Sequence, residues 1–409
     1  MELLHTDTLE EAREKLKSET EDFKLRERRV TCEASLGCIC AEDIIAGENV
    51  PPFRRSTVDG YAVIAGDSYG AGDSNPIFFR VAGQVNIEER VSIGVNSGEA
   101  VQMQTGSMIP DRATAVLMVE YTESYAADKI VAYKAVSEGE NIIQIGEDIK
   151  KGTCLIRKGR KINSRDIGMM AALGISKVNV YVPMILTIIS TGDELVDIWE
   201  SLSASKIRDI NSYALAAEAV ENGWVIRRQI RIADNKEKIF EAVSEAVGES
   251  DIILLSGGSS KGNKDYTKTV LEKITRNVFT HGISIKPGKP TILSVEQEHK
   301  VIIAGLPGHP MAALLMFRLL IVDWYMSKAG ISRPKPYFAV MQENVSSNQG
   351  RATCLPVKLV CGEADYNAVP VYAKSGSISP LSKTDGYVMI PRNKEGLKKG
   401  ERVRVEVWA

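Results

Sequence analysis

Three closely spaced loops carry the residue types that bind phosphate groups, oxyanions and divalent metal ions. They span residues 256–266, 285–290 and 305–310. The first and third follow apolar runs typical of strands and precede segments typical of helices. Glycines at such turns let backbone N–H groups face a ligand, and the start of a helix adds a partial positive charge. The three loops therefore predict phosphate chemistry.

Carboxylates at the same predicted sheet edge indicate a metal site. The run Ser-Thr-Gly-Asp-Glu-Leu at residues 190–195 follows a strand expected at residues 184–190. We expect Glu194 to lie near Asp265 of the first loop, and Mg²⁺ prefers one or two carboxylates together with phosphate oxygens. An alternative is that Asp193 and Glu194 only cap a helix. The neighbouring glycine loop favours the metal.

Two of these loops also have a simpler explanation. They are the glycine loop at residues 256–266 and the lysine loop at residues 285–290. The loop at residues 256–266 lacks both the GxxxxGK[ST] and the GxGxxG patterns, so its glycines alternatively serve only a tight turn. Lys286 and Lys289 flank Pro287 and Gly288, and a solvated charged turn is the usual explanation for such a stretch. Two prolines and a glycine, however, hold the paired ammonium groups at little entropic cost, which suits an oxyanion.

Length and composition narrow the class of protein. A chain of 409 residues predicts about two to four domains. Its net charge of −2 argues against general binding to nucleic acid or membrane surfaces, which requires a large positive field. Six cysteines without a CxxC pair predict a reducing cytosol rather than a disulfide framework or a zinc site. The apolar segment 311–326 carries Arg318 and Asp323 and falls short of a membrane span, so we expect a soluble cytoplasmic protein.

The three loops lie in a region with an α/β pattern. From Pro183, predicted strands alternate with predicted helices up to a long helix after Pro310, which implies a parallel sheet covered on both faces. Ligands of such sheets bind beyond the carboxyl ends of the strands, where the glycine loops fall. Short β-like runs predict an all-β module at residues 59–146 and a small β barrel or sandwich after residue 336. An amphipathic helix is expected at residues 8–24.

Taken in order, these motifs resemble those of the molybdopterin molybdenumtransferase family, the enzymes that insert molybdenum into molybdopterin. The similarity covers nearly the whole chain. Any one motif is weak, and the ordered set is specific. The matching segments are residues 52–62, 98–106, 146–149, 190–195, 209–212, 256–266, 286–290 and 305–310.

The resemblance implies an elongated subunit with a doubly wound three-layer α/β domain, an inserted β domain and a C-terminal small β barrel. The expected boundaries are residues 1–46 with 147–182 for domain I, 47–146 for the inserted domain II, 183–330 for the nucleotide- and pterin-binding α/β domain III, and 331–409 for the β-barrel domain IV. It also implies a homodimer, whose active site combines the α/β domain of one subunit with β parts of the other.

The implied reaction takes adenylated molybdopterin and molybdate as substrates, cleaves the pyrophosphate link with Mg²⁺, and releases AMP and molybdenum cofactor. Glu194 and Asp265 would hold Mg²⁺, and Lys286 and Lys289 would attract molybdate. The candidate catalytic residues are Asp59, Thr105, Asp148, Glu194, Asp265, Lys286 and Lys289. The candidate substrate-binding residues are Ser190, Gly192, Asp193, Ser256, Gly257, Gly258, Ser260, Gly262, Pro287, Gly288, Pro290, Pro307, Gly308, Pro310, Arg351 and Ser375. The molybdopterin adenylyltransferase is an expected partner, whereas nucleic acid and membranes are not.

Three residues depart from the family pattern. Members of the family usually have Val where this chain has Ser259 and Lys261, and Asn where it has His309. Lys261 either adds charge to the phosphate loop or is simply solvated. His309 either alters pterin contacts or replaces an amide donor. None of these residues distinguishes molybdate from tungstate, which are nearly identical in size and charge.

Two other functions fit parts of the chain. A nucleotide-binding or pyrophosphate-hydrolysing protein would share only the α/β domain, as in competence-damage-like proteins. The motifs at Asp59, Thr105 and Asp148 argue against it. A scaffold protein, like the similar domain of gephyrin, would need a specific partner groove, and nothing in the sequence indicates one.

Overall fold

The computed structural model describes residues 6–87, 91–257, 264–363, 365–372, 374 and 376–408, with only the backbone of residues 264 and 265. The chain forms two compact units. Unit 1 combines Met1–Arg28 with Val180–Ala409, and unit 2 is Arg29–Asn179.

A six-stranded sheet forms the centre of unit 1. Its strands, in spatial order, are β16 (Val225–Ile232), β13 (Ile185–Thr191), β17 (Ile252–Gly257), β21 (Val301–Pro307), β20 (Ile292–Glu296) and β18 (Val278–His281). The first four are parallel, as predicted. The expectation of a fully parallel sheet is wrong for β20 and β18, which are antiparallel to their neighbours. The short connection from β20 to β21 explains the difference, because a tight hairpin can join only antiparallel strands.

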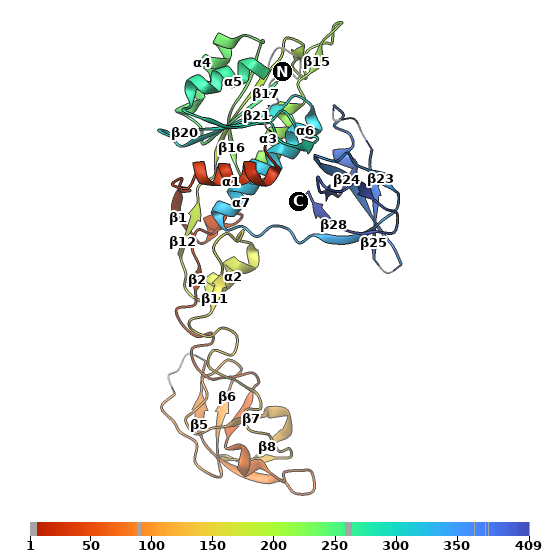
Figure 1. The fold of residues 1–409 in the computed structure, drawn as a ribbon. Coiled ribbons are helices and arrows are strands. Elements are labelled where there is room, and N and C mark those ends of the chain that lie inside the picture. Colours follow the sequence, from red (N-terminus) through yellow and green to blue (C-terminus); the bar gives the residue numbers. More distant parts are fainter. Residues whose placement is uncertain are drawn as a thin grey trace. The chain divides into compact units, whose positions relative to one another are not determined.

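Helices cover both faces of this sheet (Figure 1). On one face α4 (Lys236–Val247) packs beside α5 (Lys264–Ile274), and on the other α3 (Asn211–Glu221) packs beside α6 (Pro310–Met316). The core between sheet and helices is apolar, with Ile189, Val243, Ile253, Leu271 and Ile303 almost completely buried. This is the predicted three-layer α/β arrangement.

The helix that follows the third loop continues beyond α6. It passes through a π-helical turn (η4, Phe317–Val322) into α7 (Asp323–Ala329). The stretch Pro310–Ala329 is long and apolar enough to cross a membrane, but 72% of its most apolar window is buried inside the protein. It therefore has the surroundings of a core helix.

The N-terminal helix α1 (Leu9–Glu19) packs against α7, β18 and β20. It begins as predicted after Thr8, whose side chain forms a capping box with Glu11. It ends at Glu19, five residues before the expected end. Asp7 joins the helix to the sheet, because its carboxylate accepts a hydrogen bond from Oγ1 of Thr280 (2.9 Å).

A closed five-stranded barrel forms the C-terminal part of unit 1. Its strands, in spatial order, are β24 (Ala352–Cys361), β25 (Tyr366–Pro370), β22 (Tyr337–Met341), β28 (Arg402–Val407) and β26 (Gly386–Ile390), and β26 pairs back with β24. The short strands β23 (Val345–Ser346) and β27 (Gly396–Leu397) pair beside it. The barrel was one of two predicted forms, and closure removes the free strand edges that a sandwich would leave.

Unit 2 contains the predicted β module. Its sheet, in spatial order, consists of β7 (Ala115–Met118), β4 (Gly60–Val63), β6 (Glu99–Met103), β5 (Ile77–Val85), β9 (Lys129–Ala132) and β8 (Thr122–Ala126). The described part of this unit also contains the α-helix α2 (Ser164–Ala172), capped by Asn163. Its short paired strands are β2 (Ile44–Ile45) with β11 (Cys154–Ile156), and β3 (Arg55–Ser56) with β10 (Ile142–Ile143). The paired strands β1 (Glu27–Thr31) and β12 (Lys177–Tyr181) contain the two points at which the chain passes between the units.

Candidate active site

The carboxyl ends of three parallel strands bring the predicted loops to one edge of the sheet. Ser190 pairs with Ser256, and Thr191 pairs with Gly257, across β13 and β17. The same register continues from β17 to Pro307 at the end of β21. The segments that follow these strands therefore begin side by side, at the place where α/β sheets bind ligands.

Gly257 is required by the close approach of two strands. A Cβ added at this position would stand 1.7 Å from Oγ1 of Thr191. No side chain fits in that space, so this glycine serves strand packing at the base of the loop.

A cavity of about 290 Å³, which we call the sheet-edge cavity, lies at this edge. Asn211 holds its walls together from the start of α3. Its Nδ2 donates hydrogen bonds to Oγ of Ser256 (2.6 Å) and to the carbonyl O of Gly308 (2.9 Å). Asp209 fixes the start of the helix, because its Oδ1 accepts a hydrogen bond from the N–H of Ser212 (3.1 Å).

Two buried oxygen atoms in this cavity have no hydrogen-bond partner among the described residues. They are Oγ of Ser190 and Oδ1 of Asn211. A buried polar atom without a partner loses stabilising free energy, and a bound ligand or water restores it. The cavity is therefore built to receive polar groups.

Glu194 supplies a carboxylate to the same cavity. Its two carboxylate oxygens lie 2.9 Å from where a Cβ on Gly192 would stand, so the carboxylate folds back over this glycine. A carboxylate beside neutral oxygen groups fits a partly hydrated Mg²⁺ ion, which keeps several of its waters when it binds to proteins. Asp265, the predicted second ligand, has a side chain outside the described part of the chain.

A second cavity of about 580 Å³ is lined by positive charge, and we call it the lysine cavity. Lys286, Lys289, Arg351 and Lys374 line it, and no Asp or Glu does so among the described residues. Such an excess of cations attracts anions and has no internal counter-charge. Burial raises the pKa of the Cys354 thiol in its wall, so this thiol stays protonated at neutral pH.

Strand pairing brings these cations together from distant parts of the sequence. The short strand β19 (Ile285–Lys286) adds to β24 of the barrel, with Lys286 beside Thr353. Arg351 directly precedes the residue that pairs with Ile285. Gly288 is needed for the lysine loop to pack, since its φ is +130° and a Cβ would stand 2.3 Å from the Sδ atom of Met316.

The two cavities adjoin. Gly308 and His309 line both of them, at the end of the third predicted loop. Glu194 and Lys289, which the sequence assigns to a metal and to an oxyanion, therefore face neighbouring spaces with a common wall.

Unit 2 brings together two further predicted residues. Oδ1 of Asp59 accepts hydrogen bonds from the backbone N–H (2.6 Å) and the hydroxyl (2.8 Å) of Thr105. These hydrogen bonds hold the pKa of Asp59 below its usual range, so the carboxylate is charged at neutral pH. Asp148 is exposed, and its backbone N–H donates to the carbonyl O of Val50 (3.1 Å).

The other predicted residues divide into three groups. Pro287, Pro290 and Pro307 line the lysine cavity, and Pro310 lines the sheet-edge cavity. Asp193 is not among the residues lining either cavity, and its carboxylate accepts a hydrogen bond from the N–H of Asp234 (3.1 Å). Gly258, Ser259, Ser260, Lys261, Gly262 and Ser375 lie outside the described residues.

Several residues of the site had no assigned role in the sequence. Asn211 and Asp209 belong to a motif that the sequence shows, but their roles depend on burial and on hydrogen bonds between loops. An Asp three residues before a Ser at the start of an apolar helix is a capping signal that could have identified Asp209. Arg208 and Lys374 carry no comparable local signal.

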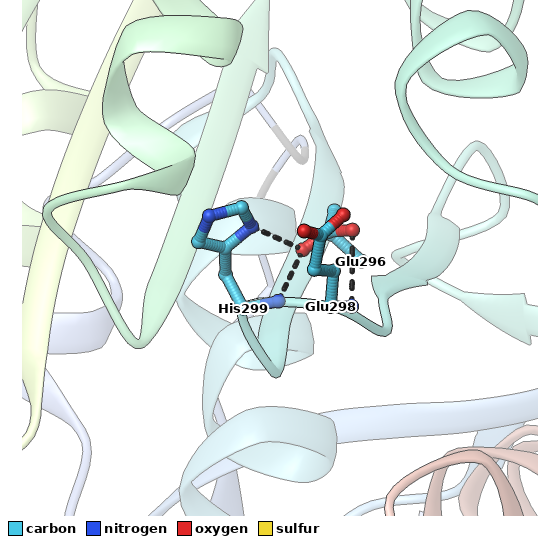
Figure 2. Close-up of side chains that lie close together, drawn as sticks. All are labelled: Glu296, Glu298 and His299. Carbon is cyan, nitrogen blue, oxygen red and sulfur yellow. Dashed lines mark hydrogen bonds and ion pairs between the residues drawn. The ribbon is translucent and has the colours of Figure 1, made fainter.

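A separate group of metal-binding residue types lies on the hairpin between β20 and β21 (Figure 2). Glu296, Glu298 and His299 come within ligand distance of one another there. The carboxylate of Glu296 accepts hydrogen bonds from the backbone N–H groups of both other residues (3.1 and 2.7 Å), so it closes the turn. This turn precedes β21, whereas the cavities lie beyond its carboxyl end, so the group is not part of the site.

Comparison with known proteins agrees with this geometry along the whole chain. Residues 7–174 match the MoeA N-terminal region (domains I and II), residues 187–326 a probable molybdopterin-binding domain, and residues 339–408 the MoeA C-terminal region (domain IV). A molybdopterin molybdenumtransferase of Staphylococcus epidermidis is 30% identical over 92% of this chain and 90% of its own. The chain belongs to the molybdopterin molybdenumtransferase (MoeA) family.

Other relatives extend the similarity. A putative molybdopterin biosynthesis protein of Methanocaldococcus jannaschii is 36% identical over 95% of this chain and 94% of its own. The crystal structure of a molybdopterin biosynthesis MoeA protein from Pyrococcus horikosii has a TM-score of 0.85, is 35% identical and covers 99% of both chains. These matches include unit 2 and the barrel, so the alternative that only the α/β domain is shared is wrong. MoeA proteins are transferases of molybdenum cofactor biosynthesis.

Proposed function

We propose that this protein cleaves adenylated molybdopterin in the presence of Mg²⁺ and molybdate, and releases AMP and molybdenum cofactor. The observation that carries the proposal is the pair of adjoining cavities. The sheet-edge cavity is lined by the carboxylates of Glu194 and Asp209, by Arg208, and by the unpaired oxygens of Ser190 and Asn211. The lysine cavity is lined by four cations and by no carboxylate among the described residues. The proposed reaction needs two such cavities, because a pyrophosphate link and an incoming dianion must be bound side by side.

The charge of each residue determines the role that we propose for it. Glu194, together with Asp265, would hold Mg²⁺, which neutralises charge that develops on the phosphate oxygens when their link breaks. Ser190 would orient the diphosphate by donating its hydroxyl hydrogen to a phosphate oxygen. Oδ1 of Asn211 can only accept, so it would take a hydrogen bond from a water of the hydrated Mg²⁺. Lys286 and Lys289 would bind and position molybdate. Preorganised charges of this kind act without reorganisation during the reaction.

Further parts of the proposal concern the assembly. We propose a cytoplasmic homodimer in which Asp59, Thr105 and Asp148 of one subunit complete the site of the other, with the molybdopterin adenylyltransferase as the partner that supplies the substrate. The charged Asp59 and its fixed orientation support a role at a polar site. Light scattering at working concentration tests this part, and a monomer would contradict it.

The decisive experiment follows AMP. Purified protein is incubated with adenylated molybdopterin, Mg²⁺ and molybdate, and AMP is measured by chromatography. We expect AMP release that requires both ions, with tungstate as a parallel arm that measures oxyanion preference. AMP at the level of a protein-free control in the complete mixture would refute the proposal.

A further inference from the structure

The lysine cavity is much larger than the oxyanion that is proposed to enter it. Its volume is about 580 Å³. A tetrahedral oxyanion has four oxygen atoms, and each takes up about as much space as a water molecule, whose share of the liquid is about 30 Å³. The anion therefore needs about 120 Å³, roughly a fifth of the cavity. The remaining space is typical of a site for an organic molecule, since such pockets span roughly 300–1,000 Å³.

Part of the wall of this cavity is apolar and firmly packed. Ile285, Met311 and Leu355 line it and are almost completely buried in the protein. They come from β19, α6 and β24, so the wall combines the α/β domain with the barrel. An apolar wall does not stabilise a hydrated dianion, whereas it packs well against a planar ring system. The lining is therefore suited to an anion and a ring together.

Tyr372 adds an aromatic ring to the same lining. It lies two residues after β25 and is 61% exposed, so its ring makes little contact with the protein itself. Partial burial and the neighbouring carboxylate of Glu343 raise the pKa of the phenol, whose hydroxyl donates a hydrogen bond to that carboxylate. The ring is thus tethered through its hydroxyl, while most of its surface remains accessible.

We propose that Tyr372 stacks on the pterin ring of the substrate, and that the lysine cavity holds this ring beside the oxyanion. The inference rests on the proposed function, which identifies the substrate as adenylated molybdopterin. Molybdenum can enter molybdopterin only if the pterin end of the substrate and the oxyanion meet in one space. Planar heterocycles stack on aromatic side chains with an offset, and this contact adds to the affinity that the apolar wall provides.

The proposal gives the substrate one direction across the two cavities. The pyrophosphate link separates the pterin from the adenosine. With the link in the sheet-edge cavity and the pterin in the lysine cavity, the substrate crosses the wall that the cavities share at Gly308. The adenosine then lies outside the lysine cavity, so a nucleotide alone does not compete with a pterin for it.

Titration of the full-length protein with pterin-6-carboxylate tests the inference. This probe carries the ring and one negative charge but no diphosphate, and its own fluorescence reports binding. Replacing an aromatic residue that stacks on a base by alanine typically weakens binding by about five- to 150-fold, so we expect a loss in this range for Tyr372→Ala. Tyr372→Phe keeps the ring and should keep most of the affinity. Tyr69→Ala removes a tyrosine of matching exposure (62%) in unit 2 and should leave the affinity unchanged.

The AMP assay gives a second readout of the same variants. Tyr372→Ala should raise the KM for adenylated molybdopterin but not the molybdate concentration needed for half-maximal AMP release, because the cations hold the molybdate. Tyr372→Phe should restore the KM. Saturating AMP should not displace the pterin probe. Circular dichroism verifies that each variant is folded.

The outcomes separate this inference from the proposed function. Equal probe affinity in the wild type and in Tyr372→Ala, or displacement of the probe by AMP, would overturn the pterin site and leave the proposed function intact. A wild type that releases AMP but does not bind the probe would overturn the site as well. A wild type that releases no AMP would contradict the proposed function, whereas the titration would still decide on the site because it involves neither nucleotide nor metal ion.

Discussion

Replacing Asn211 by Ala tests whether the sheet-edge cavity is held together as described. The side chain is only 8% exposed and gives two hydrogen bonds, to Oγ of Ser256 (2.6 Å) and to the carbonyl O of Gly308 (2.9 Å). Ser256 is 2% exposed, so its Oγ loses a buried hydrogen bond, whereas Gly308 is half-buried and can be rehydrated. One buried unsatisfied group costs about 1–3 kcal/mol, so we expect a loss of about 2–3 kcal/mol in the free energy of unfolding.

Urea denaturation of the protein, followed by the fluorescence of unit 1, measures this loss. The variant Asn277→Ala, at an exposed position, provides a matched control. The control should change stability by less than about 0.5 kcal/mol. The double variant with Ser256→Ala should cost less than the sum of the two single variants, because the second change removes the acceptor that the first left unpaired. A cost for Asn211→Ala no greater than that of the control would refute the reasoning.

Three further predictions concern charge. Lys286→Ala combined with Lys289→Ala should raise the molybdate concentration needed for half-maximal AMP release and spare nucleotide binding; an unchanged molybdate dependence would rule out the oxyanion assignment. Glu194→Gln should raise the Mg²⁺ concentration required for AMP release by at least about tenfold, as loss of an ionic metal contact implies, and an unaltered Mg²⁺ titration would exclude this ligand. Burial, only partly offset by Arg318, raises the pKa of Glu218, so the folded state binds its proton more tightly than the unfolded state does. Stability contributed by this proton is therefore lost as pH rises above the ordinary pKa range of a glutamate. The variant Glu218→Gln should raise the melting temperature at neutral pH but not near pH 4. Equal changes in melting temperature at both pH values would contradict this.

Local patterns in the sequence were enough to predict most of the elements that position the site. Apolar runs with glycine ends gave β13, β17 and β21, and a parallel register followed from the alternation with helices. The strands β20 and β18 were not predicted, because an antiparallel hairpin added to a parallel sheet depends on which edge is free. The strand β17 also extends through Gly257, since that glycine is needed between strands rather than in a turn.

The site was predictable in its charges and less so in its architecture. Lys286 and Lys289 stand in one proline-rich loop, so their pairing could be inferred from sequence alone. Their proximity to Lys374, more than 80 residues away in sequence, depends on the barrel and has no local signal. The two donated hydrogen bonds of Asn211 likewise join loops that follow different strands, so only the folded chain reveals them.

The pairing of β19 with β24 limits how this protein can be divided. Half of the lysine loop is anchored as an extra strand on the barrel, while its remainder packs on α6 through Gly288. A fragment cut before residue 337 would leave β19 without its partner strand, and a foreign barrel would need a matching edge at Ala352 and Thr353. The lysine cavity thus depends on both the α/β domain and the barrel, so the two must be transplanted or inherited together.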